Sequence, residues 1–208
     1  PGFTMSLFSM QKNYKLINNE NIEEALSGNL CRCTGYRPII DAAKSLNNKK
    51  DQDHFKKNQN RTIHLLKKIK DIDIEINHKG KKYFAPKTIL NLRRMLKKYP
   101  NSKILSGGTD LSLEVTKFRK EIKTIISLNS VSKLNFIKKS KNLIEIGATT
   151  SLFEFQNLIK KHFVDFYNVL KRYGSVQIRN VGTIAGNIAT ASPIGDTLPL
   201  LLSLDAKI

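Results

Sequence analysis

The hydrophobic pattern of residues 21–46 predicts two short helices joined by a tight turn. Asn21 can cap the first helix, and Gly28 can end it. Pro38 suits the first turn of the second helix, where its missing N–H costs nothing. Apolar residues of the second helix recur at helical spacing and share one face: Ile39, Ala42, Ala43 and Leu46. This part of the chain is therefore predicted to be helical.

A polar segment separates this helical region from the rest of the chain. Residues 47–60 (NNKKDQDHFKKNQN) carry almost no apolar side chain, which is the composition of a linker. The following segment, residues 63–82, is ambiguous, but the isoleucines at 72, 74 and 76 alternate as in a strand. Residues 78–81 (HKGK) then indicate a turn.

The remainder mixes helical and strand patterns. A helical stripe of Ile89, Leu92, Leu96 and Tyr99 ends before Pro100. Short strands are predicted at 103–106 and 124–128, a hairpin at 136–138 and 143–147, a helix after Thr150 or Ser151, and a helix over 198–204. This order favours an α+β domain over a strict βαβ repeat.

Composition narrows the classes of function. The 208 residues carry a formal net charge of +19, which raises the question of nucleic acid. The lysines are scattered and are not interleaved with aromatic residues as a stacking surface requires, so we predict a solvated surface and no nucleic-acid partner. A basic nucleic-acid-binding module stays the alternative of a different class. The charge also favours encounters with anionic ligands.

The chain has no apolar run long enough to cross a bilayer and no signal-peptide pattern, so no membrane partner is predicted. Its two cysteines are too few and too close for a disulfide framework, which indicates a reducing cytoplasm.

Two glycine-rich segments carry the strongest chemical signal. Residues 103–111 (KILSGGTDL) place Gly107 and Gly108 after a short apolar strand, and residues 181–196 read VGTIAGNIATASPIGD. Glycine lets a ligand approach the main chain closely, and consecutive amides form concave nests that hold anions. Two such segments indicate a dinucleotide held from two sides. Neither is the Gly-x-Gly-x-x-Gly fingerprint of a Rossmann unit.

The first segment also offers polar side chains. Thr109 supplies a hydroxyl donor, and a helical turn after it would attract an anion by its dipole. Asp110 is expected to cap that turn or to accept a hydrogen bond from a loop amide. The alternative interpretation is a tight turn that merely ends a strand.

Cys31 and Cys33 form a Cys-x-Cys pair, which supplies half of a four-ligand site. Thiolates at this spacing can face one iron–sulfur cluster or a zinc ion, and the alternative is two buried structural cysteines. Residues 28–39 (GNLCRCTGYRPI) resemble the second cysteine pair of the helical [2Fe–2S] domain in the xanthine oxidase family of molybdenum hydroxylases. Residues 1–3 resemble the residues directly after the first pair of that domain, so we expect that pair upstream and the chain to be a fragment cut at both ends.

The glycine-rich segments resemble the FAD domain of the same family. Residues 103–110 are similar to its pyrophosphate loop, and residues 175–196 are similar to its flavin signature. The resemblance implies that Tyr173 packs against FAD and that Asp196 accepts a ribityl or ribose hydroxyl, although Asp196 could also cap a helix. The other implied FAD-binding residues are Lys103, Ile104, Leu105, Ser106, Gly107, Gly108, Thr109, Asp110, Thr183, Ile184, Ala185, Gly186 and Asn187.

The resemblance also implies an organisation. Residues 1–47 would be the C-terminal part of a helical [2Fe–2S] domain, 48–60 a linker, and 61–208 an incomplete FAD domain of the PCMH/vanillyl-alcohol-oxidase-like α+β type. Electrons would pass from [2Fe–2S] to FAD and on to NAD, in a hetero-oligomer with a molybdopterin-binding large subunit that oxidises a purine. Relatives that act on an aldehyde, carbon monoxide or an aromatic ring are the alternative.

No catalytic residue is expected in this chain itself. Glu114 and Glu145 look like isolated carboxylates without an acid–base partner, and no serine or cysteine has a nucleophile's setting. The four histidines lie among lysines or at element edges, which indicates surface positions. This absence is typical of a protein whose chemistry belongs to a cofactor.

Overall fold

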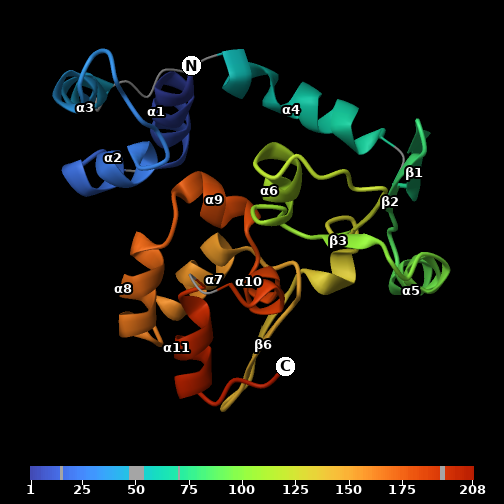
Figure 1. Ribbon diagram of the computed structural model, residues 1–208. Helices are drawn as coiled ribbons and strands as arrows, with labels where there is room; N and C mark the ends of the chain where they lie inside the picture. The colour runs from blue at the N-terminus through green and yellow to red at the C-terminus, as the bar shows by residue number, and fades with distance from the viewer. Residues whose placement is uncertain (15, 47–53, 70, 193–194) are drawn as a thin grey trace. The chain divides into compact units, whose positions relative to one another are not determined.

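The structure is a computed structural model that describes residues 1–14, 16–46, 54–69, 71–192 and 195–208. The chain forms two units, Pro1–Lys70 and Asp71–Ile208 (Figure 1). The first unit is helical and the second mixes helices with strands, as the sequence predicted. None of the described helices combines the length and the apolar character needed to cross a bilayer.

The first unit contains α1 (Gly2–Asn13), α2 (Asn19–Leu26), α3 (Tyr36–Ser45) and α4 (His54–Lys67). Helix α2 begins earlier than predicted, because Asn18 is its cap and accepts a hydrogen bond from the Asn21 amide at 2.8 Å. The prediction of Asn21 as the cap is therefore wrong. Pro38 does lie in the first turn of α3. The core consists of Met10, Ile17, Ile22, Ala25, Leu26 and Ala43.

Helix α4 lies where the polar composition indicated a linker. Residues 47–53 of that segment are outside the described residues, but its second half is helical, and no described residue of α4 is buried. The ring of Phe55 contacts the ring of Phe8 on α1, with centroids 5.3 Å apart. The boundary that the sequence predicted between the linker and the FAD domain, after residue 60, thus falls inside a helix. The domain boundaries stay a prediction.

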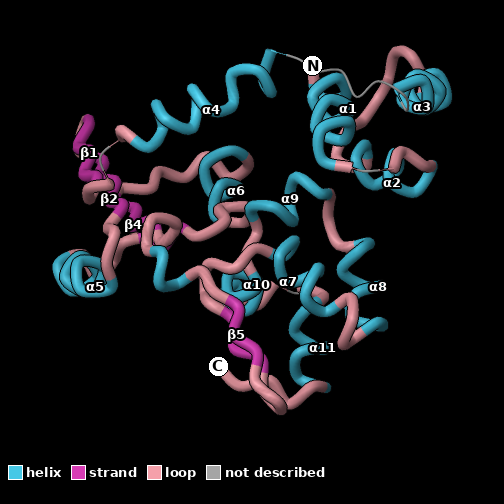
Figure 2. Tube along the Cα trace, turned by 180° about the vertical axis from the view of Figure 1, so that it is seen from behind, coloured by secondary structure: helices cyan, strands magenta, loops and turns pink. Residues whose placement is uncertain are grey.

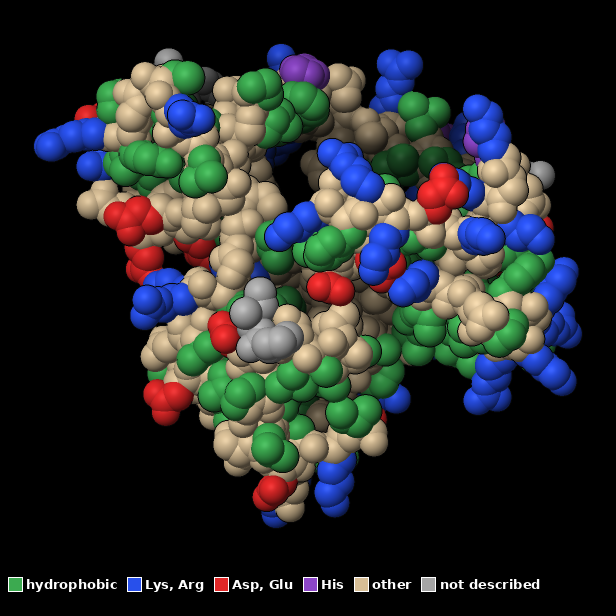
Figure 3. All heavy atoms as spheres, viewed as in Figure 1, with side chains coloured by type: hydrophobic (Ala, Val, Ile, Leu, Met, Phe, Trp, Pro, Cys, Tyr) green, Lys and Arg blue, Asp and Glu red, His purple; other side chains and the backbone are tan. Residues whose placement is uncertain are grey.

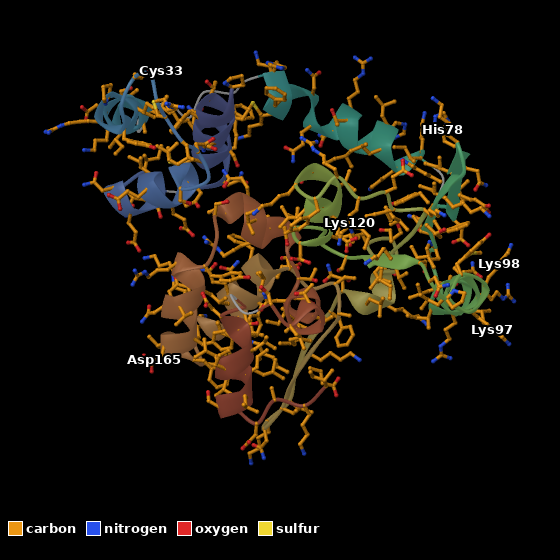
Figure 4. All side chains as sticks on the ribbon, in the orientation of Figure 1. Cys33, His78, Lys97, Lys98, Lys120 and Asp165 are labelled. Carbon is orange, nitrogen blue, oxygen red and sulfur yellow. The ribbon has the colours of Figure 1, made fainter. Side chains whose placement is uncertain are left out.

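The second unit begins with a four-stranded sheet in the order β1-β2-β4-β3. Strands β1 (Ile74–His78) and β2 (Lys81–Ala85) form a hairpin around the predicted turn, although β2 itself was not predicted. Strand β2 pairs in parallel with β4 (Thr124–Ser127), which pairs in parallel with β3 (Lys103–Leu105). Helix α5 (Ile89–Lys98) packs on the sheet, and the buried residues of this part are Phe84, Leu92, Ile126 and Val131. Lys97 and Lys98 extend from α5 away from the sheet (Figure 4).

The rest of the second unit is a helical cluster beside a two-stranded hairpin of β5 (Ile137–Lys139) and β6 (Ile144–Ile146) (Figure 2). Its helices are α7 (Leu152–Ile159), α8 (Val164–Arg172), α9 (Val176–Val181), α10 (Ile184–Thr190) and α11 (Thr197–Ser203). Of the two caps that the sequence left open for α7, the structure uses Ser151, in a capping box with Glu154. The core consists of Leu152, Phe155, Leu158, Ile159, Phe166, Leu170 and Ile184.

Candidate functional site

The first glycine-rich segment follows β3 and leads into α6 (Leu111–Thr116). Gly108 has φ +77°, in the left-handed region that favours glycine. The amides of Gly107, Gly108 and Thr109 donate no hydrogen bond to any residue that the structure describes. Three successive N–H groups are thus free to bind an anion.

The Ser106 hydroxyl also supports anion binding by this segment. Its Oγ is buried and has no hydrogen-bond partner among the described residues. A buried polar group without a partner costs about 1–3 kcal/mol, which a ligand with acceptor oxygens would offset. The donor set of this segment therefore fits a phosphate or diphosphate group.

The charged residues in and beside this segment make other contacts than the sequence predicted. Asp110 takes the cap position of α6, but its exposed carboxylate makes no cap hydrogen bond. The Lys103 ammonium donates to Glu114 at 2.9 Å, and this hydrogen bond holds the pKa of the Glu114 carboxyl below its ordinary value. Glu114 is therefore paired, which corrects the interpretation of an isolated carboxylate. Ile104 and Leu105 serve as strand residues of β3.

The second glycine-rich segment is mostly the start of a helix. Thr183 caps α10, and its Oγ1 accepts a hydrogen bond from the Gly186 amide at 3.1 Å. The Thr183 carbonyl accepts the Asn187 amide at 3.0 Å. Ile184 is a core residue with 5% exposure, and its amide donates to the Thr150 carbonyl at 3.3 Å. These amides, which the sequence assigned to a phosphate, thus bind protein oxygens instead, while Ala185 stays half-buried.

The two segments touch although they are distant in the sequence. A Cβ atom on Gly107 would collide with the Val181 carbonyl oxygen and lie 2.8 Å from the Gly182 Cα atom. A Cβ atom on Gly182 would lie 3.6 Å from Thr109 Oγ1. Glycine at position 107 lets the two backbones meet, so the free amides of the first segment lie directly against the second.

A chain of hydrogen bonds joins the second segment to its neighbours. Asn187 donates through Nδ2 to the Tyr173 hydroxyl at 2.8 Å and accepts a hydrogen bond from the Thr197 hydroxyl at Oδ1. Burial raises the pKa of the Tyr173 phenol, the Asn187 hydrogen bond opposes that rise, and the charges of Asp196 and Asp110 add to it. Both carboxylates therefore lie within electrostatic reach of Tyr173.

Asp196 lies at the cap position of α11 but makes no cap hydrogen bond, and it is exposed. Together with Val169 and Arg172 it lines a hollow of about 340 Å³. A larger hollow of about 460 Å³, lined by Lys98 to Lys103 and Glu121 to Thr124, lies at the opposite ends of β3 and β4 from the glycine-rich segment. Except for Lys103, the donors and carboxylates described above do not line this larger hollow.

The scattered lysines predicted a solvated basic surface, but Arg179 of α9 is buried. It is 1% exposed, and its Nη1 donates to the carbonyls of Tyr173 at 3.1 Å and Gly174 at 2.9 Å. Sequence reasoning missed this role, and it also missed Thr197.

Cys31 and Cys33 lie in the loop between α2 and α3, where Figure 4 labels Cys33. Cys33 is exposed, and Cys31 is half-buried. The Thr34 amide donates to Cys31 Sγ at 3.3 Å, and it is the main cause, followed by the Cys33 amide, of a pKa of the Cys31 thiol below its ordinary value. Such a thiol is suited to ligate a metal as the thiolate.

Among the described residues, no group of three or more His, Cys, Asp or Glu side chains could hold a metal ion. The four histidines are exposed, as predicted. Lysine and arginine side chains are spread over the face drawn in Figure 3 and do not form one stripe on it.

Comparison with known proteins adds to this geometry. Residues 75–208 match the family described as the FAD binding domain in molybdopterin dehydrogenase, and residues 1–44 match the [2Fe-2S] binding domain. Xanthine dehydrogenase 1 of Arabidopsis thaliana is 29% identical over 273 residues, covering 100% of this chain and 20% of that protein. The chain thus spans about a fifth of the length of this relative.

Other relatives match a part of the chain. The nicotinate dehydrogenase FAD-subunit of Eubacterium barkeri is 34% identical over 130 residues, covering 61% of this chain and 44% of that subunit. The crystal structure of a Cu,Mo-CO dehydrogenase in a cyanide-inactivated form superposes with a TM-score of 0.52 and 25% identity, covering 58% of this chain and 43% of that one.

Proposed function

The chain belongs to the family of FAD-binding domains in molybdopterin dehydrogenases, and from this premise we propose that it is the electron-transfer part of a molybdenum hydroxylase. It would carry FAD in its second unit and contribute to one [2Fe–2S] cluster in its first. The observation that carries the proposal is the row of free amides at Gly107, Gly108 and Thr109, held against the second glycine-rich segment.

The residues that would hold FAD fall into classes according to their hydrogen-bonding groups. The free amides from Gly107 to Thr109 and the Ser106 hydroxyl would bind the diphosphate, within the segment Lys103–Asp110. The segment Thr183–Asn187 would enclose the chain next to the diphosphate, Tyr173 would face the cofactor, and Asp196 would accept a hydroxyl. Bound FAD would supply the hydride and electron chemistry that these side chains lack.

The cluster would be held by Cys31 and Cys33. A [2Fe–2S] cluster takes four protein ligands, so two more would come from outside these 208 residues, whose sequence contains two cysteines. The amides that favour the Cys31 thiolate would also donate to the sulfur when it binds iron.

The finer proposal is a purine oxidation of the xanthine dehydrogenase type, with NAD as the electron acceptor and a molybdopterin-binding chain or domain as the partner. Alignment of the whole chain with xanthine dehydrogenase 1 supports it, since that relative spans both units. A second candidate is the oxidation of an aromatic ring, supported by the 34% identity over 130 residues to the nicotinate dehydrogenase FAD-subunit.

A flavin titration of the full-length protein tests the proposal. We expect a flavin absorption spectrum and stoichiometric uptake of FAD. We expect Gly186→Asp to abolish the uptake, because a side chain there meets Thr183 Oγ1 at 2.7 Å and adds a negative charge beside the diphosphate site.

Gly80→Asp is the matched control, since position 80 has open space around it at the hairpin turn between β1 and β2, and aspartate is among the residues that adopt its left-handed φ of +75°. A colourless wild-type protein that takes up no FAD, or a Gly186→Asp variant that stays yellow, would contradict the proposal. Retention on DNA that disappears near physiological salt would indicate only the attraction of lysines.

A further inference from the structure

Arg179 is the largest side chain that the structure buries almost completely, with 1% exposure. A guanidinium leaves water only at a high cost, unless its donors are satisfied by protein acceptors. The groups packed around Arg179 therefore have to supply hydrogen-bond acceptors for its guanidinium.

The acceptors of Arg179 lie at the C-terminal end of α8 and in the turn after it. Nη1 donates to the carbonyls of Gly174 at 2.9 Å and Tyr173 at 3.1 Å, and lies 3.5 Å from that of Lys171. The last carbonyls of a helix have no partner within the helix, and a cation is favourable there. Arg179 thus closes the end of α8 and fixes the backbone of the turn from α8 to α9.

Tyr173 is the residue whose backbone is fixed in this way. Its side chain leaves the turn and accepts the hydrogen bond from Asn187 on α10, which in turn binds Thr197 on α11. A chain of contacts therefore runs from one buried guanidinium to the side chains that line the proposed flavin site.

We infer that Arg179 is a positioning residue for the flavin, which acts by fixing the Tyr173 backbone and so placing the Tyr173 ring and hydroxyl. This inference rests on the proposed function. Lysine does not replace arginine here, because an ammonium is more strongly hydrated than a guanidinium and therefore leaves water at a higher cost.

A double-mutant cycle on FAD affinity in the full-length protein tests the inference. We expect Arg179→Lys to weaken FAD binding by about 10- to 100-fold, as loss of a partner that orients a ligating residue does. In a Tyr173→Ala background no ring is left to place, so the same change should weaken binding by less than about 2-fold. Arg94→Lys, at an exposed arginine of α5, is the control and should change nothing.

The readouts separate positioning from general stability. Circular dichroism should give the same helix content for wild type and Arg179→Lys. Spectrophotometric titration, with Tyr173→Phe to identify the Tyr173 phenol, should show a lower pKa of that phenol in Arg179→Lys than in wild type. Equal FAD affinity of Arg179→Lys and wild type, additive effects in the cycle, or an unfolded variant would each overturn the inference. Wild-type protein that binds no FAD would instead overturn the proposed function.

Discussion

The two glycine-rich segments of the second unit look alike in sequence but use their glycines differently. In the first, Gly108 takes a left-handed conformation and Gly107 makes room for the backbone at Val181. The amides there are left without protein partners among the described residues. In the second, the residues after Thr183 form a helix, and the Gly186 amide donates a hydrogen bond to the Thr183 hydroxyl.

The difference shows that a glycine-rich motif does not by itself mean free amides. In the first segment glycine exposes N–H groups, which is the requirement for an anion nest. In the second segment small residues allow close packing, and Gly182 lies beside Ile178, Leu152 and Thr109. The first segment would therefore provide most of the hydrogen bonds to an anionic group, and the second would pack closely against the ligand.

Gly107→Ala should have the largest effect on this arrangement. The added Cβ would collide with the Val181 carbonyl, which is backbone and cannot turn away. We expect a loss of about 3 kcal/mol in the free energy of unfolding of the second unit, at the upper end for overpacking, together with loss of FAD uptake. Urea unfolding and a flavin titration measure the two effects.

Gly80→Ala is the comparison for Gly107→Ala, because position 80 has φ +75° and no atom within 4 Å of an added Cβ. It should cost less, about 1–2 kcal/mol for the left-handed conformation. An equal loss for both variants would contradict the contact between the two segments.

Gly108→Ala should have a smaller effect. The left-handed backbone at φ +77° costs an alanine about 1–2 kcal/mol. The added Cβ would lie 2.8 Å from Leu105 Cδ1, the far end of a side chain that can move. Gly108→Asn should be tolerated better, since asparagine visits this region more readily. Similar unfolding midpoints for the alanine and asparagine variants would speak against a left-handed turn here.

Thr183→Val should cost less again, about 1 kcal/mol, through loss of the helix cap that binds the Gly186 amide. Thr183→Ser keeps the hydroxyl and is the matched control. Thermal unfolding of the three proteins measures the cost. If valine and serine were equivalent, the Gly186 amide would not depend on this cap.

Tyr173→Phe should have the smallest effect on the free energy of unfolding, and this effect should appear only in alkaline solution. Burial raises the pKa of Tyr173 above its ordinary value of 10.0, so the folded protein holds the phenol proton more tightly than the unfolded chain. The contribution of Tyr173 to the free energy of unfolding is therefore complete below pH 10.0 and is lost as the pH rises toward the raised pKa. Denaturant unfolding above that pH should show a steeper decline for wild type than for the phenylalanine variant, and parallel declines would exclude the raised pKa.

Much of the local structure was predictable because its causes are local. Alternating isoleucines specified β1, and the Ser151–Glu154 pair specified the start of α7. The missed helices α8, α9 and α10 are short, and α8 and α10 depend on a core formed with other elements, which a sequence window does not contain. The cap of α2 was misplaced by three residues because several asparagines can serve there and packing selected Asn18.

The residues of the proposed site were predicted, but the function of each one was not. The sequence did not identify Arg179 as buried and indicated that Glu114 is isolated, whereas the structure buries the first and pairs the second with Lys103. Both errors have one origin: whether a charge finds a partner depends on residues from other elements.

By itself the sequence determined the family, the cysteine pair and the two glycine-rich segments, because these depend on residue type and spacing. Only the tertiary structure decided that Gly107 lies against Val181 and Gly182, that amides are free in one segment and bound in the other, and that Arg179 fixes Tyr173. The reason is physical: residue types specify which hydrogen bonds a chain could make, whereas packing determines which donors find acceptors and which are left for a ligand.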